Sequence, residues 1–438
     1  MSSPSISPSV RTTAALRVVL ILLVVSVSIN YIDRGNLSIA APLMKDDLGM
    51  SPAQLGVLLS AFFWTYSTFQ LVSGWLVDRL DVNWILAAGF LLWSVATAAT
   101  GLIRGFDLLI LLRLLLGVGE SVAYPCYSKI LAGHFAEHQR GLANALIDAG
   151  TKVGPALGSL VGGLLMASYG WRSFFIVLGL VSLLWLPLWY KWMPSGHGVV
   201  PTESEKAPSI GDIVGRRAAW ATFAGHFCGN YFWYFLLSWL PFYLVRERGF
   251  SMQQMGSLGS LAYFVTAAAT TVAGLLSDRF IAAGVAPTRV RKACTGFGLG
   301  FATFIVGVTV FPNRTASIFL LLFACMSYGV FASSHWAITQ TLAGPLAAGK
   351  WSGIQNFVAN LAGVAAPAIT GFVVNATGHF FGAFAISAAV ALCGAMIYTF
   401  VLGPVKPVDW QGPTQRGGSV ATLMGAGDWT SDDPRPGS

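Results

Sequence analysis

Six ionisable side chains interrupt long apolar segments of this 438-residue chain. They are Asp33, Arg34, Arg113, Glu120, Asp148 and Lys152. Three are acids and three are bases, so the fully ionised set carries no net charge. Charges in an apolar interior are tolerated when they are paired and hydrogen-bonded. The set therefore predicts a buried polar network in which charged species can be bound.

The bases of this set are candidates for holding an anion. Arginine stays protonated at working pH, and its planar fork matches a carboxylate. Arg34 is therefore the first candidate, with an internal salt bridge to a nearby acid as the alternative. Lys152 follows Asp148 by four residues, a helical spacing that allows the two to pair. Either they neutralise each other, or Lys152 supplies a second positive charge that suits a dianion.

The acids are candidates for carrying a proton. Arg113 and Glu120 are seven residues apart, which places them on one face of a helix. A buried carboxylate beside a cation can gain or lose a proton when its surroundings change. We therefore expect Glu120 and Asp33 to exchange protons and Arg113 to help attract an anion. A permanent Arg113–Glu120 pair is the alternative.

The elements that carry these charges are expected to be membrane-spanning helices. The chain is 55% hydrophobic and only 10% charged, with a mean hydropathy of +0.66. Segments 48–77, 82–103, 218–245 and 249–277 contain no charged residue, and each exceeds the roughly 20 residues that cross a bilayer as a helix. The five cysteines lie in apolar segments without metal-type spacing, so no metal site is expected.

Breaks between the apolar runs predict twelve spans in an all-α polytopic membrane protein. The predicted spans are 16–41, 53–77, 83–103, 106–131, 141–168, 173–192, 219–245, 254–277, 293–312, 316–341, 351–375 and 380–403. A polar linker, 193–218, divides them into two six-helix bundles, 1–192 and 219–403. The polar tail, 404–438, is expected to be disordered and cytoplasmic.

The basic residues indicate the orientation in the membrane. With both termini in the cytoplasm, seventeen Lys and Arg residues fall in inner loops and tails and six in outer loops. This asymmetry follows the positive-inside rule. It also explains the net charge of +8 without nucleic acid as a partner.

An internal repeat supports two pseudo-symmetric halves. Residues 74–79 read GWLVDR and residues 274–279 read GLLSDR, 200 positions later. The shared positions, which we expect to take part in gating, are Gly74, Asp78 and Arg79 in the first copy and Gly274, Asp278 and Arg279 in the second. A chance match is the alternative, but equivalent places in two halves favour a rocking transporter.

The sequence resembles the major facilitator superfamily and, within it, the anion:cation symporter family of bacterial sugar-acid permeases and sialin-like carriers. The resemblance covers the twelve-helix body. It is carried by YIDRGNLS at 31–38, by Arg113 and Glu120, and by SHWAITQTLAGP at 334–345 with Gln355-Asn356. One departure is that LDVN at 80–83 replaces the basic pair that usually follows the first loop motif, so a gate built on that basic cluster is expected to be weaker in the N-terminal half.

The resemblance implies a proton-coupled symporter of an organic anion that works by alternating access. A hexonate, hexuronate or aldarate is favoured, and an aromatic acid is the alternative. It implies the carboxylate-binding role of Arg34 and raises the expectation that five neutral side chains contact substrate. These are Tyr31, Tyr66, Ser333, Trp336 and Asn356, for which packing is the alternative. No cofactor beyond protons, a bacterial inner-membrane location and a monomer are expected.

Other classes of protein fit the sequence less well. An organophosphate antiporter of the same superfamily would use paired bases such as Arg34 with Arg113 or Lys152, but acids within its spans are less expected. A drug exporter would not need three bases in its cavity, and a receptor would usually carry a signalling domain. An enzyme is not expected, because the sequence has no nucleophile–base constellation or phosphate-binding loop.

Overall fold

The computed structural model describes residues 10–135, 137–194 and 208–410, and the described part is helical without strands. The first half contains α1 (Val10–Asp47), α2 (Pro52–Arg79), α3 (Val82–Thr100), α4 (Phe106–Ser121), α5 (Ala123–His134), α6 (Glu137–Ser182) and α7 (Trp185–Trp192). The second half contains α8 (Ile210–Val214), α9 (Arg217–Arg246), α10 (Met252–Ala282), α11 (Pro287–Ala302), η1 (Thr303–Val306), α12 (Gly307–Val310), α13 (Arg314–Ala332), α14 (His335–Thr377), α15 (Phe381–Met396) and η2 (Ile397–Val401).

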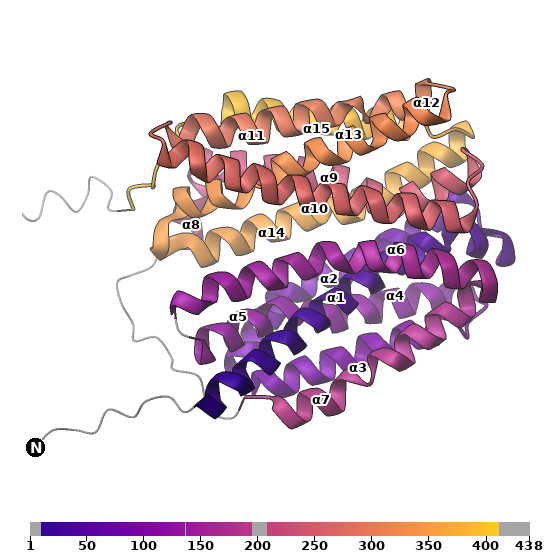
Figure 1. The fold of residues 1–438 in the computed structure, drawn as a ribbon, viewed down its shortest axis with the longest axis horizontal. Helices are drawn as coiled ribbons and strands as arrows, with labels where there is room; N and C mark the ends of the chain where they lie inside the picture. Colours follow the sequence, from indigo (N-terminus) through magenta and orange to yellow (C-terminus); the bar gives the residue numbers. More distant parts are fainter. Residues whose placement is uncertain (1–9, 136, 195–207, 411–438) are drawn as a thin grey trace, which may run out of the picture.

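The twelve-span, two-bundle fold is confirmed. In Figure 1 the helices of the first half lie below those of the second half, and the axes of the long helices are roughly aligned with one another. Eight helices of the described chain meet length and hydropathy criteria for crossing a membrane, and one of them covers two predicted spans. The others of the twelve are α2, α4 with α5, and α9.

Two glycines divide continuous helical segments into separate spans. Gly170 in α6 has φ +76° and Gly344 in α14 has φ +64°, a left-handed conformation that glycine adopts at no steric cost. Gly170 separates the fifth and sixth predicted spans, and Gly344 separates the tenth and eleventh. The predicted break between spans 351–375 and 380–403 coincides with Gly378, which ends α14.

The two halves repeat local structure at the same offset as the loop motif. Ser51 and Gln54 form a reciprocal capping box that starts α2. Ser251 and Gln254 form the same box at the start of α10, 200 residues later. A capping box satisfies backbone donors that the first helical turn leaves free, so both helices begin at equivalent points.

The described ends of the chain lie at one end of the bundle, which we call the termini end; the opposite end is the far end (Figure 1). The predicted linker contains α8, while 195–207 lie outside the described residues. The predicted tail begins with residues that pack on α14, since Val408 N donates to Leu342 O (2.9 Å) and Trp410 Nε1 to Ala343 O (2.9 Å). Its remainder, 411–438, lies outside the described residues.

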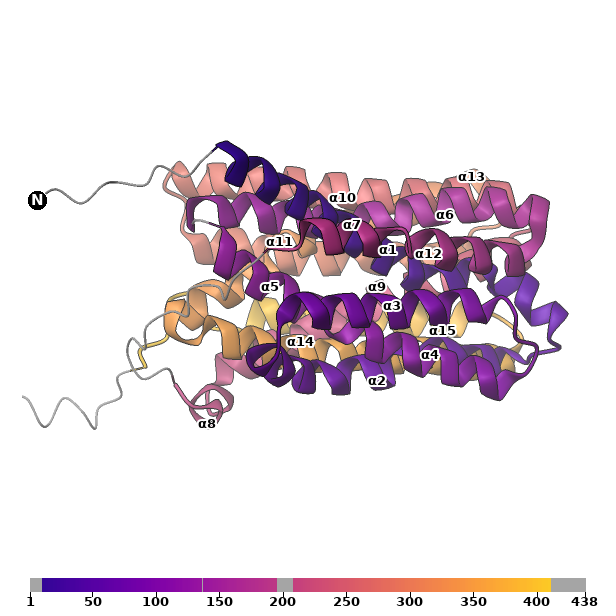
Figure 2. The same ribbon diagram turned by 90° about the horizontal axis from the view of Figure 1, so that it is seen from below.

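The halves meet along three helix pairs, α1 with α9, α2 with α14 and α6 with α10. Figure 2 shows α6 beside α10 on one side and α2 beside α14 on the other. Two of these pairs cross at glycines near the far end. A Cβ added to Gly56 would lie 2.9 Å from Gly371 Cα, and one added to Gly163 would lie 2.8 Å from Gly256 Cα. These approaches are possible only because the four positions lack side chains.

Polar contacts also join the halves between α1 and α9. Arg246 at the end of α9 forms a salt bridge with Asp46 and donates to Pro42 O (2.7 Å). Ser38 in α1 donates to Leu237 O in α9 (2.6 Å). The two halves are therefore closely joined toward the far end.

Candidate functional site

Four of the six predicted charges lie together between α1 and α4. The exposed fractions are 0% for Asp33, 8% for Arg34, 5% for Arg113 and 0% for Glu120. α1 packs on α6, and α4 packs on α2 and α3. The cluster has two acids and two bases, which preserves the predicted charge balance.

Arg34 is held by Glu120 and by aromatic rings. Its Nε donates to Glu120 Oε2 at 2.9 Å. Its guanidinium carbon lies 4.5 Å from the ring centre of Tyr31, 4.3 Å from that of Tyr66 and 5.3 Å from that of Phe62. A guanidinium between ring faces is stabilised by the ring quadrupoles. The internal salt bridge that was the alternative for Arg34 is thus present. Glu120 forms it with Arg34 and not with Arg113.

Asp33 is held by hydrogen bonds from α1 and α3. Its Oδ1 accepts from Asn36 Nδ2 (3.1 Å) and from Thr97 Oγ1 on α3 (3.0 Å). Arg113 Nη1 reaches the backbone oxygen of Asp33 at 3.4 Å and lies within electrostatic range of both Asp33 and Glu120. Arg113 therefore compensates both acids without forming a close ion pair with either.

Each buried acid has one occupied and one unoccupied oxygen. Asp33 Oδ2 and Glu120 Oε1 make no hydrogen bond of normal geometry with any residue that the structure describes. Asn30 is the polar neighbour beside Glu120, at longer range. A buried anionic oxygen without a donor is costly, and a proton on that oxygen removes the charge. Both acids are thus arranged so that protonation leaves their existing hydrogen bonds in place.

Asp148 and Lys152 form the predicted pair on α6, with Lys152 Nζ 2.6 Å from Asp148 Oδ1. The lysine side chain is 22% exposed and the aspartate side chain 65% exposed, so this pair is far more accessible than the Arg34 cluster. Both residues lie within electrostatic range of His335 in the second half. The pair therefore faces the region between the two halves.

The second half presents neutral groups near this pair. The rings of His226 and His335 are 4.6 Å apart, and Trp336 lies 4.9 Å from His226. Gln355 bridges Thr339 Oγ1 (2.7 Å) and His226 Nδ1 (3.3 Å). This cluster offers aromatic faces and hydrogen-bonding groups without a formal charge.

The other predicted substrate contacts are placed differently. Ser333 donates to Val330 O of its own helix (2.7 Å). Asn356 donates to Gln70 Oε1 of the first half at 3.3 Å, so it joins the halves. Tyr31 and Tyr66 surround Arg34. No described contact brings Ser333 to the charged cluster.

The predicted gating residues lie at the termini end of α2 and α10. Arg79 is exposed and lies over the ring of Trp75 (4.5 Å), and Asp278 and Arg279 are also exposed. A Cβ on Gly74 or Gly274 would meet no atom within 4 Å. The side chain of Asp78 lies outside what the structure describes. No contact that the structure describes for the other five motif residues bridges the halves, and the gating role of the motif stays a prediction.

Sequence reasoning missed several residues that position the site. Thr97 and Asn36 hold Asp33, Gln70 meets Asn356, and Phe62 lies over Arg34. It also missed the Asp46–Arg246 bridge at the far end. One signal was available for the far end, because Gly56 and Gly256 share the 200-residue offset of the loop motif.

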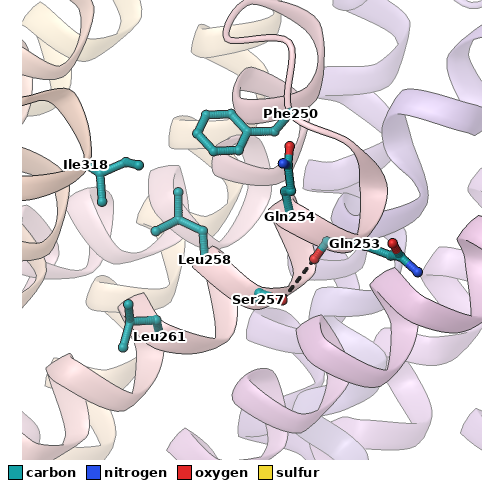
Figure 3. Close-up of a pocket in the computed structure, with 7 residues that line it drawn as sticks. All are labelled: Phe250, Gln253, Gln254, Ser257, Leu258, Leu261 and Ile318. Carbon is teal, nitrogen blue, oxygen red and sulfur yellow. Dashed lines mark hydrogen bonds between the residues drawn. The ribbon is translucent and has the colours of Figure 1, made fainter. Parts of the chain in front are cut away.

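A surface groove on α10 and α13 is separate from these charges (Figure 3). Its lining residues are Phe250, Gln253, Gln254, Ser257, Leu258, Leu261 and Ile318. None of them is charged or was predicted as a site residue. The described residues contain no group of three or more His, Cys, Asp or Glu side chains that could hold a metal ion.

Comparison with known proteins identifies the family. The Major Facilitator Superfamily profile matches residues 23–367. The "Probable galactarate/D-glucarate transporter GudP" of Bacillus subtilis (strain 168) is 28% identical over 435 residues, covering 92% of this chain and 95% of that protein. The "Hexuronate transporter" of the same organism is 29% identical, covering 90% and 95%.

The name of another relative refers to a different kind of anion. The "Probable sulfoacetate transporter SauU" of Cupriavidus necator (strain ATCC 17699 / DSM 428 / KCTC 22496 / NCIMB 10442 / H16 / Stanier 337) is 30% identical, covering 90% of this chain and 94% of that protein. Among solved structures, a bacterial homologue of the human lysosomal transporter Spinster matches with a TM-score of 0.76 at 18% identity, covering 87% of this chain and 96% of that chain. This likeness supports the fold.

These matches span the helical body and belong to a family of transporters rather than enzymes. The chain is a multi-pass membrane protein of the Major Facilitator Superfamily, of the anion:cation symporter type.

Proposed function

We propose that the protein is a secondary active transporter that carries a sugar acid together with protons by alternating access. The names of its relatives support the substrate class, since they include galactarate/D-glucarate, hexuronate and L-galactonate transporters. The single observation that carries the coupling is the buried salt bridge between Arg34 and Glu120. It joins the candidate anion-binding group to a candidate proton carrier.

The salt bridge supports competition between Glu120 and the substrate for Arg34. While Glu120 is ionised, it satisfies the guanidinium and repels an incoming carboxylate. When Glu120 takes a proton, Arg34 loses its counter-ion, and a substrate carboxylate can replace it with a charge-assisted bond. Proton and anion then bind cooperatively, and each raises the affinity of the other by the same factor.

Asp33 supplies a second proton-carrying group beside the same arginine. This role is supported by Oδ2, which has no described hydrogen-bond partner, and by Oδ1, which accepts hydrogen bonds from Asn36 and Thr97. Arg113 keeps the cluster positive once the acids are neutral. Tyr31 and Tyr66 contribute hydroxyl groups around the carboxylate, and Trp336 and Asn356 contribute from the second half.

The proposed setting is the bacterial cytoplasmic membrane, with both termini in the cytoplasm and the chain working as a monomer. The excess of basic residues at the termini end supports this orientation. The far end then faces outward. The close glycine crossings there correspond to a conformation closed toward the outside.

Uptake into proteoliposomes tests the proposal. Purified protein is reconstituted, and a panel of sugar acids is offered with an inward proton gradient, with and without a protonophore. We expect concentrative uptake that the protonophore abolishes. Glu120→Gln should retain exchange of labelled for unlabelled substrate but lose accumulation driven by the gradient. The matched control is Glu247→Gln, the same change at an exposed residue after α9.

Two results would count against proton coupling through Glu120. Undiminished accumulation by Glu120→Gln would remove this residue from the mechanism. Uptake that ignores the gradient but requires an anion inside the vesicle would favour an antiporter, with organophosphate or phosphate as the substrate to test next. Uptake of aromatic carboxylates in place of sugar acids would retain the coupling and change the substrate class.

A further inference from the structure

Lys152 is the accessible cation of the site, whereas Arg34 is the enclosed one. Arg34 is 8% exposed and lies among three rings and a buried carboxylate. The partner of Lys152 is Asp148, whose side chain is 65% exposed. Ion pairs with such exposure contribute little free energy, because water solvates the separated partners. An incoming anion can therefore take over Lys152 while Asp148 turns to water.

The packing of α1 against α6 gives the spacing between the two cations. A Cβ added to Gly150 would lie 2.6 Å from Val27, and one added to Gly154 would lie 2.9 Å from Tyr31 Cβ. Both helices begin at the termini end and lie side by side (Figure 1). They therefore run parallel, with residue 154 level with residue 31.

This register places the two cations at different depths. Lys152 precedes the shared level by two residues, and Arg34 follows it by three. At about 1.5 Å of rise per residue, their Cα atoms are separated by about 7.5 Å along the helix axes. Both side chains lean toward the beginnings of their helices, so the charged groups keep a similar offset along the helix axes.

A six-carbon dianion fits this spacing. Five carbon–carbon bonds of about 1.5 Å in a zigzag place the terminal carboxyl carbons of an extended chain about 6 Å apart. Charge-assisted bonds of about 2.8 Å at each end extend the reach further. One terminal carboxylate can therefore contact Arg34 while the other contacts Lys152, and the chain between them spans the difference in depth.

The neutral groups of the second half suit the hydroxyls between two carboxylates. His335 Nδ1–H donates to Ala332 O at 3.1 Å, so Nε2 of this ring is free of its proton and is an acceptor. His226 Nδ1 faces the Gln355 amide nitrogen at 3.3 Å, so this histidine carries its proton on Nε2. One ring thus offers an acceptor and its neighbour a donor. Lys152 lies within electrostatic range of His335.

We propose that Lys152 forms a second anion subsite, and that Arg34 and Lys152 together select six-carbon dicarboxylate sugar acids over monocarboxylate ones. This inference rests on the proposed function and names its substrate class. Asp148 is a resting partner that holds Lys152 between cycles and excludes monoanions from the subsite. His226 and His335 contact the hydroxyl groups of the same substrate.

The test compares substrates that differ in one terminal group. We compare a hexarate, which is a dianion, with the open-chain hexonate of the same carbon skeleton. Uptake of each is measured in proteoliposomes under a proton gradient. We expect the wild-type protein to have the lower KM for the hexarate. Lys152→Gln should raise the hexarate KM at least tenfold and change the hexonate KM less than twofold. Lys191→Gln, at the termini end of α7, is the matched control.

The retained hexonate uptake shows that the variant is folded. Asp148→Asn is the second variant, and it should lower the hexarate KM because Lys152 loses its competing partner. Wild-type uptake of hexonate without preference for hexarate, or equal effects of Lys152→Gln on both substrates, would overturn the two-cation subsite and leave proton-coupled sugar-acid transport intact. Absence of uptake for every sugar acid would instead overturn the proposed function and this inference together.

Discussion

The glycine crossings at the far end allow one quantitative prediction about the conformational equilibrium. In Gly256→Ala, the new Cβ on α10 would lie 2.7 Å from Ser159 O and 3.1 Å from Gly163 Cα on α6. Ordinary contacts of a Cβ begin near 3.4 Å, and both atoms that it meets belong to backbone. The crossing can relieve the overlap only if the two halves part by several tenths of an ångström.

The expected magnitude follows from the cost of overpacking. Forcing an extra carbon into a close-packed contact costs about 1–3 kcal/mol. This cost applies to the conformation with a closed far end and disappears when α6 and α10 separate. The population of the open far end should therefore increase about fivefold to about a hundredfold, at about 1.4 kcal/mol for each factor of ten.

Cysteine labelling measures this change directly. Leu237→Cys serves as the reporter, because Leu237 is 3% exposed and its side chain approaches Gly35 of the other half. The five native cysteines are first replaced by alanine, and the reaction rate with a maleimide is measured in detergent. Gly256→Ala should raise this rate within the predicted range.

The matched control is Gly300→Ala on α11, where an added Cβ would meet no atom within 4 Å. This control variant measures the general effect of replacing glycine by alanine in a helix. Equal labelling rates in the two variants would refute the argument that the glycine crossing controls the closed far end. A lower rate in Gly256→Ala would show that the added carbon stabilises closure.

Two further variants test the site and the packing. Arg34→Lys keeps the charge but loses the fork and the stacking between the rings of Tyr31 and Tyr66, so the KM for sugar-acid uptake should rise at least tenfold; an unchanged KM would contradict carboxylate binding by Arg34. Trp239→Phe removes the indole donor to the Pro367 carbonyl (3.0 Å), a hydrogen bond whose loss should cost about 0.5–1.5 kcal/mol. Thermal unfolding in detergent should show a lower midpoint than for the exposed Trp84→Phe control, and equal midpoints would contradict a structural role for that bond.

Much of the fold could be predicted because membrane spans leave a strong signal in sequence. Long charge-free segments marked the spans, and the offset of 200 between GWLVDR and GLLSDR indicated two related halves. The pairing of Arg34 with Glu120 could not be predicted, because it depends on how α1 crosses α4. Sequence spacing placed Glu120 on one face with Arg113, but spacing within one helix does not decide between partners on two helices.

The far end was harder to predict for a related reason. Asp46 and Arg246 lie 200 residues apart and meet only after the halves close. Glycines also have no chemical signature of a crossing, since the same residue serves in turns, bends and helix contacts. The contact between Gly163 and Gly256 is therefore visible only in the assembled bundle.

The two buried acids, Asp33 and Glu120, also bear on the net charge that one transport cycle would move across the membrane. A dianion that enters with one proton moves one negative charge, and an inside-negative potential of 100 mV opposes this step by about 2.3 kcal/mol. With both acids protonated, the same dianion moves no net charge and the potential has no effect. A monoanion with two protons would be drawn inward by the potential. Under the proposed coupling, two acids in one cluster would let a single carrier work electroneutrally on one substrate and electrogenically on another.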